Sequence, residues 1–355
     1  MERLPEPPYA IADWVTQWLL RLCARDTTSG HEDQGLGELE ELLSDLGANI
    51  RLHRVAPGRT NILAVWGVPR VLFSTHLDTV PPYIPPRLDE AKGRIWGRGT
   101  CDAKGQIVAQ LAAIRWLREE GLDDLAWLGV VGEETDSAGA LAAEVWRDAL
   151  DSCFALVNGE PTELTCAAGQ RGIVRLRLAC EGKAAHSGLP DRGRSAAWLL
   201  LDWLQRIRER PRPEHDDLGP EVWNLGLLRA GEASNVVPAH AEAELLARTI
   251  PGSRFVLDVR KQSPPEGSVE ILAEDPPFLY PRLEGYPQVA VPFGSDVPIL
   301  RKLLVGQNVA LVGPGSISVA HSEDEHIDVA DLVAGAELNR SLAKYFLDRC
   351  ERGER

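Results

Sequence analysis

The segment Leu125-Ala-Trp-Leu-Gly-Val-Val-Gly-Glu-Glu134 runs from an apolar stretch into two adjacent carboxylates. Residues 125–131 are short and apolar, as expected of a buried β-strand. Ionised Glu133 and Glu134 at the end of such a strand repel each other, so a fold seldom keeps them there without a cation. The segment therefore predicts a strand that delivers two acids to a metal site.

The surrounding chain predicts an α/β layered domain around this strand. Further short apolar runs, bounded by Gly and Pro or ending at an acid, predict strands at 61–66, 71–75, 154–157 and 309–312. Helical periodicity predicts helices at 11–24, 36–46 and 105–120. Alternating buried strands and helices are typical of an α/β fold, whose functional sites lie at strand ends.

The middle of the chain has a different pattern. Runs that look like strands of an antiparallel sheet occur at 172–180, 222–228, 241–248 and 268–272, with helical periodicity at 195–208 and 253–262. Two helices on one face of an antiparallel sheet form an α+β module. Because candidate site residues lie on both sides of it, we expect an insertion: residues 1–168 and 281–355 form one domain, and residues 169–280 the other.

Composition excludes several classes of function. The formal net charge of −15 argues against nucleic acid or an anionic membrane as partner. The N-terminal residues 1–8 lack the basic region of a secretion signal, and no apolar run is long enough to span a membrane. The cysteines have no CxxC spacing, which indicates reduced thiols: Cys23, Cys101, Cys153, Cys166, Cys180 and Cys350. We therefore expect a cytoplasmic protein.

Two polar motifs precede the glutamate pair. His76 and Asp78 stand at i and i+2, so on a strand they point to one side, and Asp78 can hold one ring nitrogen of His76 while the other binds a metal. A solvent-facing pair at a turn is the simpler interpretation of these two residues alone. Asp102 follows the flexible positions Gly97 and Gly99 and precedes a helix, which suits either a bridging ligand or a helix N-cap.

The remaining candidates are acids and histidines in loops. One of Glu133 and Glu134 can bind a metal while the other stays free as a general base. Glu160 follows the strand at 154–157, and His321 lies in a polar loop; each alone would pass for a solvated loop residue. The same interpretation is kept for His326.

Taken together, these motifs resemble the M20 family of metallopeptidases and deacylases. The most specific stretches are His76-Leu-Asp-Thr-Val-Pro81 and Trp96-Gly-Arg-Gly-Thr-Cys-Asp-Ala-Lys-Gly105, and the resemblance covers nearly the whole chain. It implies a zinc-exopeptidase-like α/β/α catalytic domain with an inserted α+β, ferredoxin-like lid and dimerisation domain. The loop Gly313-Pro-Gly315 before His321 is most similar to the acetylornithine deacetylase branch.

The resemblance also implies roles for the candidates. His76, Asp102 and Glu160 match the ligands of one zinc ion, and Asp102, Glu134 and His321 match those of the other, with Asp102 bridging. Glu133 matches the general base, and Asp78 the carboxylate behind the ligands. The expected cofactor is two Zn²⁺ per chain, for which Co²⁺ or Mn²⁺ can substitute in a mixed histidine and carboxylate site.

In the inserted domain, the resemblance assigns three further residues. His186 matches a histidine that reaches the active site of the partner subunit and stabilises the oxyanion, which implies a homodimer formed through the lid. Asn235 and Arg248 match positions that bind the substrate carboxylate or the oxyanion. The chain departs from the family pattern at Leu246, where an acid is frequent, and at Phe293-Gly-Ser-Asp-Val, which matches neither the desuccinylase nor the deacetylase pattern.

The sequence thus predicts a dinuclear metal-dependent amidohydrolase that acts on a small N-acyl amino acid, with N-acetylornithine or N-acetylcitrulline as the preferred substrate. Other activities of the same family stay open: succinyl-diaminopimelate desuccinylase, carrier-linked lysine hydrolase, and dipeptidase or carboxypeptidase. A non-catalytic metal-binding module is the remote alternative, and a free Glu133 beside the ligands argues against it.

Overall fold

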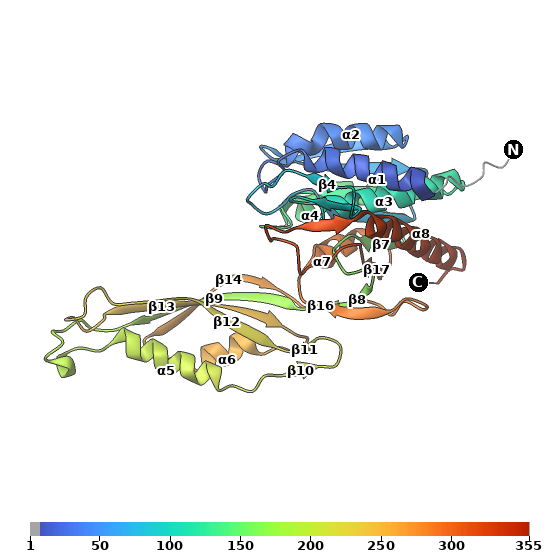
Figure 1. The fold of residues 1–355 in the computed structure, drawn as a ribbon. Coiled ribbons are helices and arrows are strands. Elements are labelled where there is room, and N and C mark those ends of the chain that lie inside the picture. Colours follow the sequence, from blue (N-terminus) through green and yellow to red (C-terminus); the bar gives the residue numbers. More distant parts are fainter. Residues whose placement is uncertain (1–7, 355) are drawn as a thin grey trace. The chain divides into compact units, whose positions relative to one another are not determined.

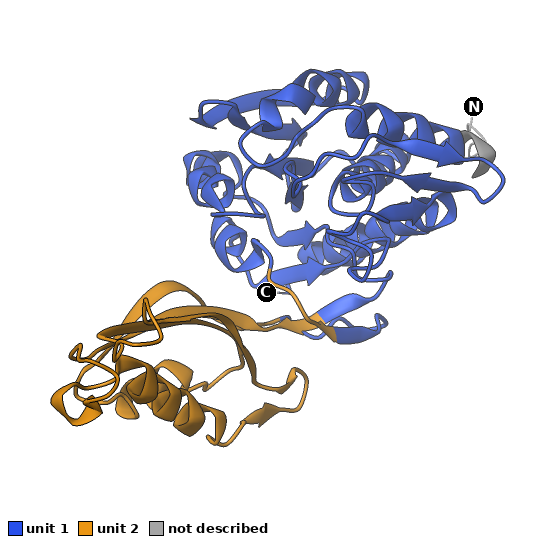
Figure 2. Cartoon of the chain, turned by 60° about the vertical axis from the view of Figure 1, so that its left-hand side comes forward, with its two compact units in different colours: residues 1–167, 280–289, 295–355 blue, residues 168–279, 290–294 orange. Residues whose placement is uncertain are grey.

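The computed structural model describes residues 8–354, which form two compact units (Figure 2). Unit 1 comprises the chain up to Ala167, Tyr280–Val289 and the chain from Ser295, and unit 2 comprises Ala168–Leu279 and Ala290–Gly294. Residues 290–294 belong to unit 2, although the sequence pattern predicts them in the first domain. Residues 1–7, most of the N-terminal segment that lacks the basic region of a secretion signal, lie outside the described residues.

Unit 1 is built on a six-stranded sheet with the order β1-β2-β6-β3-β7-β17. Figure 1 labels two of its strands, β7 and β17. Its strands are β1 (Asn49–Ala56), β2 (Arg59–Trp66), β3 (Val71–His76), β6 (Leu125–Val130), β7 (Ala155–Asn158) and β17 (Asn308–Leu311). β6, β3, β7 and β17 run parallel, and β1 and β2 form an antiparallel hairpin at one edge. β3, β6, β7 and β17 are buried along their whole length. β6, β3 and β7 lie inside the sheet, as their mostly apolar sequences predict, whereas β17 is the strand at its other edge.

Helices complete the layers of unit 1 and confirm the predicted α/β class. They are α1 (Pro8–Cys23), α2 (Leu36–Asp45), α3 (Lys104–Glu119), α4 (Ala138–Ala142), α7 (Val297–Leu300) and α8 (Val329–Glu351). α3 packs against β3, α1 and α8, and is buried on nearly every side except near its C-terminus. The long helix α8 was not predicted from the sequence. A small sheet of β18 (His326–Asp328), β5 (Arg94–Trp96) and β4 (Arg87–Asp89) joins two distant loops.

Unit 2 has the predicted α+β architecture, and its element order is that of a ferredoxin-like fold. The elements are β9 (Gly172–Glu181), α5 (Ala196–Arg208), β12 (Val222–Ala230), β13 (His240–Thr249), α6 (Phe255–Lys261) and β14 (Gly267–Asp275). The antiparallel sheet has the order β12-β13-β9-β14. Alternate residues of β9 and β13 pack with α5 and α6 into one core, centred on the buried Trp203 and Phe255.

Two minor sheets remain. β8 (Cys166–Gln170), β15 (Phe278–Leu279) and β16 (Gln288–Val291) form a three-stranded sheet where the chain passes between the units, and β10 (Glu214–His215) pairs with β11 (Gly219–Pro220). Among the helices of residues 8–354, none has the length and apolar character needed to cross a bilayer.

Candidate metal centre

The candidate ligands of unit 1 follow the ends of its central strands. His76 is the last residue of β3, Glu134 follows β6, and Glu160 follows β7. His321 lies in the loop after β17, and Asp102 lies just before α3. Since β3, β6, β7 and β17 are parallel, their carboxyl ends meet at one edge of the sheet. Residues that are far apart in sequence are therefore brought together there.

The structure arranges these residues in two groups that share Asp102. His76, Asp102 and Glu160 form one group, and Asp102, Glu134 and His321 form the other, with ligand atoms within 4.8 Å of one another in each. Asp102 Oδ1 lies 2.9 Å from His76 Nε2, whereas Asp102 Oδ2 lies 3.4 Å from His321 Nε2. Each oxygen of Asp102 thus faces a different group, which is the placement that a bridging carboxylate requires.

The charges of the site fit a divalent cation in each group. Burial raises the pKa of Glu160 well above its usual value, and the neighbouring Asp102, Glu133 and Glu134 raise it further. Hydrogen bonds to Asp102 and Glu134 raise the pKa of His321 to about 10. Without metal, Glu160 therefore favours its protonated form, and His321 holds its proton. Metal ions would replace these protons and satisfy a mixed set of nitrogen and oxygen ligands.

Several simpler interpretations of these residues are wrong. His76 and Asp78 are buried, not solvent-facing, and Glu160 is buried as well. The N-cap of α3 is Ala103, without a side-chain cap, so Asp102 does not cap the helix. His326, also interpreted as a solvated loop residue, is instead the partly buried first residue of β18. Its Nδ1–H donates to the carbonyl oxygen of Asp324, and its ring centroid lies 4.5 Å from that of Trp96.

Glu133 and Glu134 have different surroundings, although they are adjacent. Glu134 Oε1 lies 2.9 Å from His321 Nε2, whereas Glu133 belongs to neither ligand group. Removal from water raises the pKa of Glu133 well above its usual value, and the charges of Asp296 and Glu134 add to this. A carboxylate with a raised pKa beside a metal site is suited to accept a proton.

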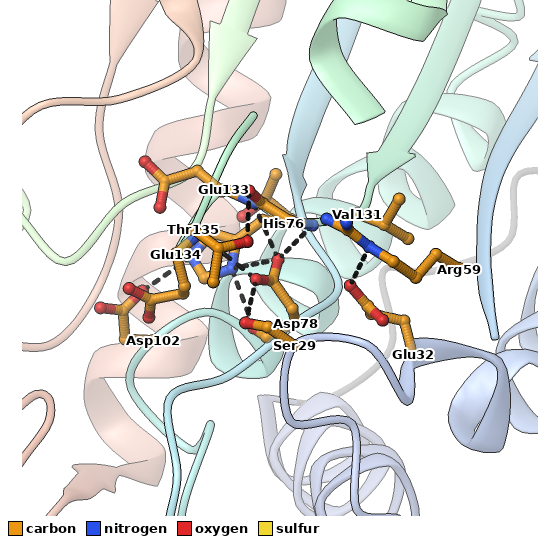
Figure 3. A network of polar contacts seen from close by, with 12 residues as sticks. Ser29, Glu32, Arg59, His76, Asp78, Asp102, Val131, Glu133, Glu134 and Thr135 are labelled. Carbon is orange, nitrogen blue, oxygen red and sulfur yellow. Dashed lines mark hydrogen bonds and ion pairs between the residues drawn. The ribbon is translucent and has the colours of Figure 1, made fainter. Parts of the chain in front are cut away.

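Asp78 holds the ligands through two different groups. Its backbone carbonyl oxygen accepts the Nδ1–H of His76 at 2.9 Å, while its carboxylate lies 3.6 Å from that nitrogen. The carboxylate accepts backbone N–H bonds from Gly132, Glu133 and Glu134 (Figure 3). The predicted support of His76 thus comes mainly from the main chain of Asp78, and the carboxylate fixes the turn that carries both glutamates.

A second layer of polar residues supports this turn and was not predicted from the sequence. Ser29 Oγ donates to Asp78 Oδ2 at 2.8 Å, and Arg59 binds Glu32 (Figure 3). Arg59 also binds Asp136. A Cβ atom on Gly132, whose φ is +77°, would lie 1.6 Å from Arg59 Nη2. The arginine therefore packs directly against the turn. Ser29 lies in a turn and Glu32 begins a short 3₁₀ helix, Glu32–Gly35. Neither follows a predicted strand, so the sequence alone does not single them out.

In unit 2, the structure brings two of the three predicted residues together. His186 forms an antiparallel bridge with Val236, and the N–H of Ser187 donates to the carbonyl oxygen of Asn235 at 3.0 Å. Arg248 lies near the far end of β13, about 26 Å along the strand from His240 at the end nearer Asn235. Within one chain, Arg248 and Asn235 are therefore too far apart to hold the same carboxylate.

An α/β sheet with two ligand groups joined by one carboxylate is the arrangement expected of a metal-dependent hydrolase. The family description "Peptidase family M20/M25/M40" matches residues 72–345, so the chain belongs to this family of metallo-hydrolases. An M20 peptidase domain-containing protein of Schizosaccharomyces pombe is 31% identical over 338 residues, covering 91% of this chain and 82% of that protein. A Paracoccidioides brasiliensis protein named a probable carboxypeptidase is 33% identical, and the match covers 89% of this chain and 81% of that protein.

Solved structures share the fold. Aminopeptidase PepT from Bacillus cereus superimposes with a TM-score of 0.79 at 20% identity, covering 95% of this chain and 99% of that chain. The M20 family metallo-carboxypeptidase Sso-CP2 from Sulfolobus solfataricus superimposes with a TM-score of 0.72 at 16% identity. The match covers 94% of this chain and 99% of that chain. These findings support the family and the fold. They do not support the closer resemblance to acetylornithine deacetylase, which stays a prediction.

Proposed function

We propose that this protein is a dinuclear metal-dependent amidohydrolase that releases an amino acid with a free α-carboxylate from a small acyl or aminoacyl substrate. The observation that carries this proposal is the position of Asp102, whose two oxygens face two separate groups of ligands. A single metal would not require a shared carboxylate. Glu133, beside the ligands but outside both groups, supplies the base that hydrolysis needs.

The ligand set fits Zn²⁺ in both groups, and Co²⁺ or Mn²⁺ can replace it. His76, Asp102 and Glu160 would hold one ion, and Asp102, Glu134 and His321 the other. Bound metal ions would polarise the amide carbonyl of the substrate and lower the pKa of the attacking water.

The protein's own groups carry the proton transfers. Glu133 takes the proton of the attacking water and passes it to the nitrogen of the leaving amino acid. Asp78 keeps Glu133 in place through the backbone of the Gly132–Glu134 turn. His186 is set up as a donor, because its Nδ1 accepts the N–H of Gly188 at 3.1 Å and the proton is left on Nε2. We assign this Nε2–H to the oxyanion that forms during hydrolysis.

The two candidate types of substrate would be cleaved at the same kind of bond. An N-acyl amino acid such as N-acetylornithine or N-acetylcitrulline and a dipeptide both carry the scissile amide next to a carboxylate-bearing carbon. The names of the relatives favour a carboxypeptidase, and we therefore rank the short peptide ahead of the acetylated amino acid. Desuccinylase and carrier-linked lysine hydrolase activities keep the same chemistry with a different acyl group or carrier.

The substrate panel that tests this proposal contains N-acetylornithine, N-acetylcitrulline, N-succinyl-diaminopimelate and dipeptides with varied C-terminal residues. The purified protein is assayed after chelation and again after addition of Zn²⁺ or Co²⁺. We expect metal-restored release of the C-terminal amino acid, with dipeptides ahead of the acetylated substrates. Turnover that persists after complete metal removal would refute the proposed mechanism.

A homodimer formed through unit 2 is part of the proposal. β12 is an edge strand, and its exposed side chains include Leu225, Leu227 and Leu228. An apolar edge strand is a template for pairing with another chain, and pairing with β12 of a second copy would cover these leucines. Two copies would also remove the difficulty with Arg248, because one chain could supply Arg248 and the other Asn235 and His186 to the same substrate.

Replacing His186 by Ala is expected to lower kcat by about 10²–10³-fold, the usual loss when one oxyanion donor is removed. His186 is exposed and lies outside the core of unit 2, so the fold should remain intact. Metal content should equal that of the wild type, because His186 belongs to neither ligand group. Steady-state kinetics together with metal analysis measure both, and an unchanged kcat would refute the role in oxyanion binding.

Mixing two variants of low activity tests whether His186 acts across the dimer. A heterodimer of H186A and E133Q chains has one site in which Glu133 comes from the first chain and His186 from the second. If His186 acts in trans, mixed subunits should show turnover well above that of either variant alone. No recovery, with subunit exchange demonstrated by native mass spectrometry, would place both residues in the site of the same chain.

A further inference from the structure

Glu325 accepts hydrogen bonds from four backbone N–H groups of the loop that carries Asp102. We infer that Glu325 is the positioning residue that fixes Asp102 between the two ligand groups, so that it sets both metal sites at once. The expected effect on metal binding rests on the proposed two-metal site. The contacts between Glu325 and the loop do not depend on that proposal. Glu325 is not among the candidate ligands, and its carboxylate lies in neither ligand group.

The contacts are spread along the loop from Gly97 to Asp102. The carbonyl oxygen of Glu325 accepts the N–H of Gly97 at 2.9 Å. Its side-chain Oε1 accepts the N–H groups of Gly99, Cys101 and Asp102 at 2.9, 3.1 and 3.1 Å. The backbone N–H of Asp102 is thus hydrogen-bonded to Glu325. This N–H is adjacent to the Cα atom that carries the bridging carboxylate.

The local fold explains why Glu325 reaches this loop. β18 pairs with β5 so that His326 lies opposite Trp96, and the pairing continues one residue further to Glu325 and Gly97. The loop then turns back over the carboxylate, helped by Gly97 and Gly99, which have φ angles of +136° and +83°. The result is a ring of backbone N–H groups around an anion, an arrangement that binds carboxylates and phosphates in other proteins.

The two oxygens of Glu325 have separate partners. Oε1 faces the loop amides, and Oε2 accepts a hydrogen bond from Arg98 Nη1. Glu325 is 1% exposed and Arg98 is 1% exposed, so neither charge is solvated by water. A buried carboxylate keeps its charge only when charged or N–H donors surround it, and here both kinds are present. Arg98 thus neutralises Glu325, and Oε1 is left to organise the loop.

Loss of this contact should affect both metals together. Asp102 is the one residue common to the two ligand groups, whereas His321 and Glu160 each belong to one group. In Glu325→Gln, the amide has one acceptor oxygen, so its NH₂ group must face either the loop N–H groups or Arg98. Either orientation places donor against donor. Asp102 then loses its fixed position without any change in the ligands themselves.

The matched control is Glu323→Gln, which removes the same charge from an exposed position two residues away. H321A serves as the comparison for damage to one group. The metal-free wild type and the three variants are titrated with Co²⁺ and followed by its absorption spectrum. We expect E325Q to weaken both binding steps by about 10–100-fold, as is typical for residues behind metal ligands. H321A should weaken one step strongly, and E323Q neither.

A second measurement needs no metal. Hydrogen–deuterium exchange of metal-free protein, read by mass spectrometry over residues 97–104, reports the N–H groups that Glu325 binds. Faster exchange in E325Q, with E323Q equal to wild type, is the expected result. Exchange in E325Q equal to that of the wild type would overturn the inference. A Co²⁺ titration of E325Q in which one binding step keeps wild-type affinity would also overturn it. If the wild type bound fewer than two Co²⁺, the proposed two-metal site would fail, while exchange would still decide the contact.

If E325Q does not fold, Glu325→Asp provides the second variant. The aspartate keeps the charge for Arg98 but shortens the side chain by one carbon, so its oxygen withdraws from the loop N–H groups. We expect partial loss of exchange protection at residues 97–104 and a smaller loss of Co²⁺ affinity than in E325Q. Full protection and wild-type affinity in E325D would show that the loop does not depend on the position of this carboxylate.

Discussion

Replacing Glu133 by Gln should lower turnover by about 10²–10⁴-fold, the usual contribution of a positioned general base, while the metal content stays that of the wild type. The amide keeps the size of the side chain but cannot take a proton from water. The backbone N–H of residue 133 still donates to Asp78, so the turn keeps its shape. Steady-state kinetics and metal analysis of the same preparation measure the two effects.

The neighbouring variant is the control for this prediction. Glu134 lies 2.9 Å from His321 and belongs to a ligand group, so Glu134→Gln should weaken metal binding. If E133Q lost metal and E134Q kept it, the roles of the two glutamates would be exchanged. Adjacent residues on a turn differ in the direction of their side chains, and this comparison tests that difference directly.

The sequence predicted the candidate metal ligands because each of them followed a recognisable strand or motif. Parallel strands place their carboxyl ends at one edge, so the strand pattern alone predicted that His76, Glu134 and Glu160 would meet. The structure confirms that these residues lie in two compact groups with Asp102 and His321. The sequence could not show which oxygen of Asp102 faces which group, because this depends on side-chain geometry.

Residues behind the ligands were harder to predict, because their partners are distant in the chain. Glu325 and Asp102 are 223 positions apart, and Arg59 and Asp136 are 77 positions apart. In one sequence, such residues look like ordinary surface charges. Their burial and their roles appear only when the sheet brings the loops together. The same reason explains why Asp78 was assigned to His76 and not to the Gly132–Glu134 turn.

Helix α8 was missed for a different reason. Its sequence mixes Ala, Gly and charged residues, so the apolar stripe is weak, although Leu342 and Phe346 are fully buried. It is held by packing against α3, which is itself buried on nearly every side. Tertiary contacts, more than local periodicity, therefore determine this helix. In unit 2, by contrast, the regular alternation of β9 and β13 predicted the strands to within about two residues.

Asp102 is the position at which substitution should be most damaging to metal binding. In Asp102→Ala, both ligand groups lose a member, so we expect that neither metal binds with wild-type affinity and that turnover is lost. Asp102→Asn has nearly the same shape, but its one oxygen can face only one group and its NH₂ faces the other. We expect D102N to retain one Co²⁺ and to show no turnover beyond background. Absorption titrations with Co²⁺ and kinetics on the same samples measure both.

The contrast between these two variants separates a bridging carboxylate from an ordinary ligand. If Asp102 served a single metal, D102A would still bind one ion through the other group, and it would resemble H321A or E160A. If it bridges, D102A should be worse than either single-group variant, and D102N should equal them in stoichiometry. The geometry predicts the second outcome, because Oδ1 lies 2.9 Å from His76 Nε2 and Oδ2 lies 3.4 Å from His321 Nε2. One wild-type metal step in D102A would contradict it.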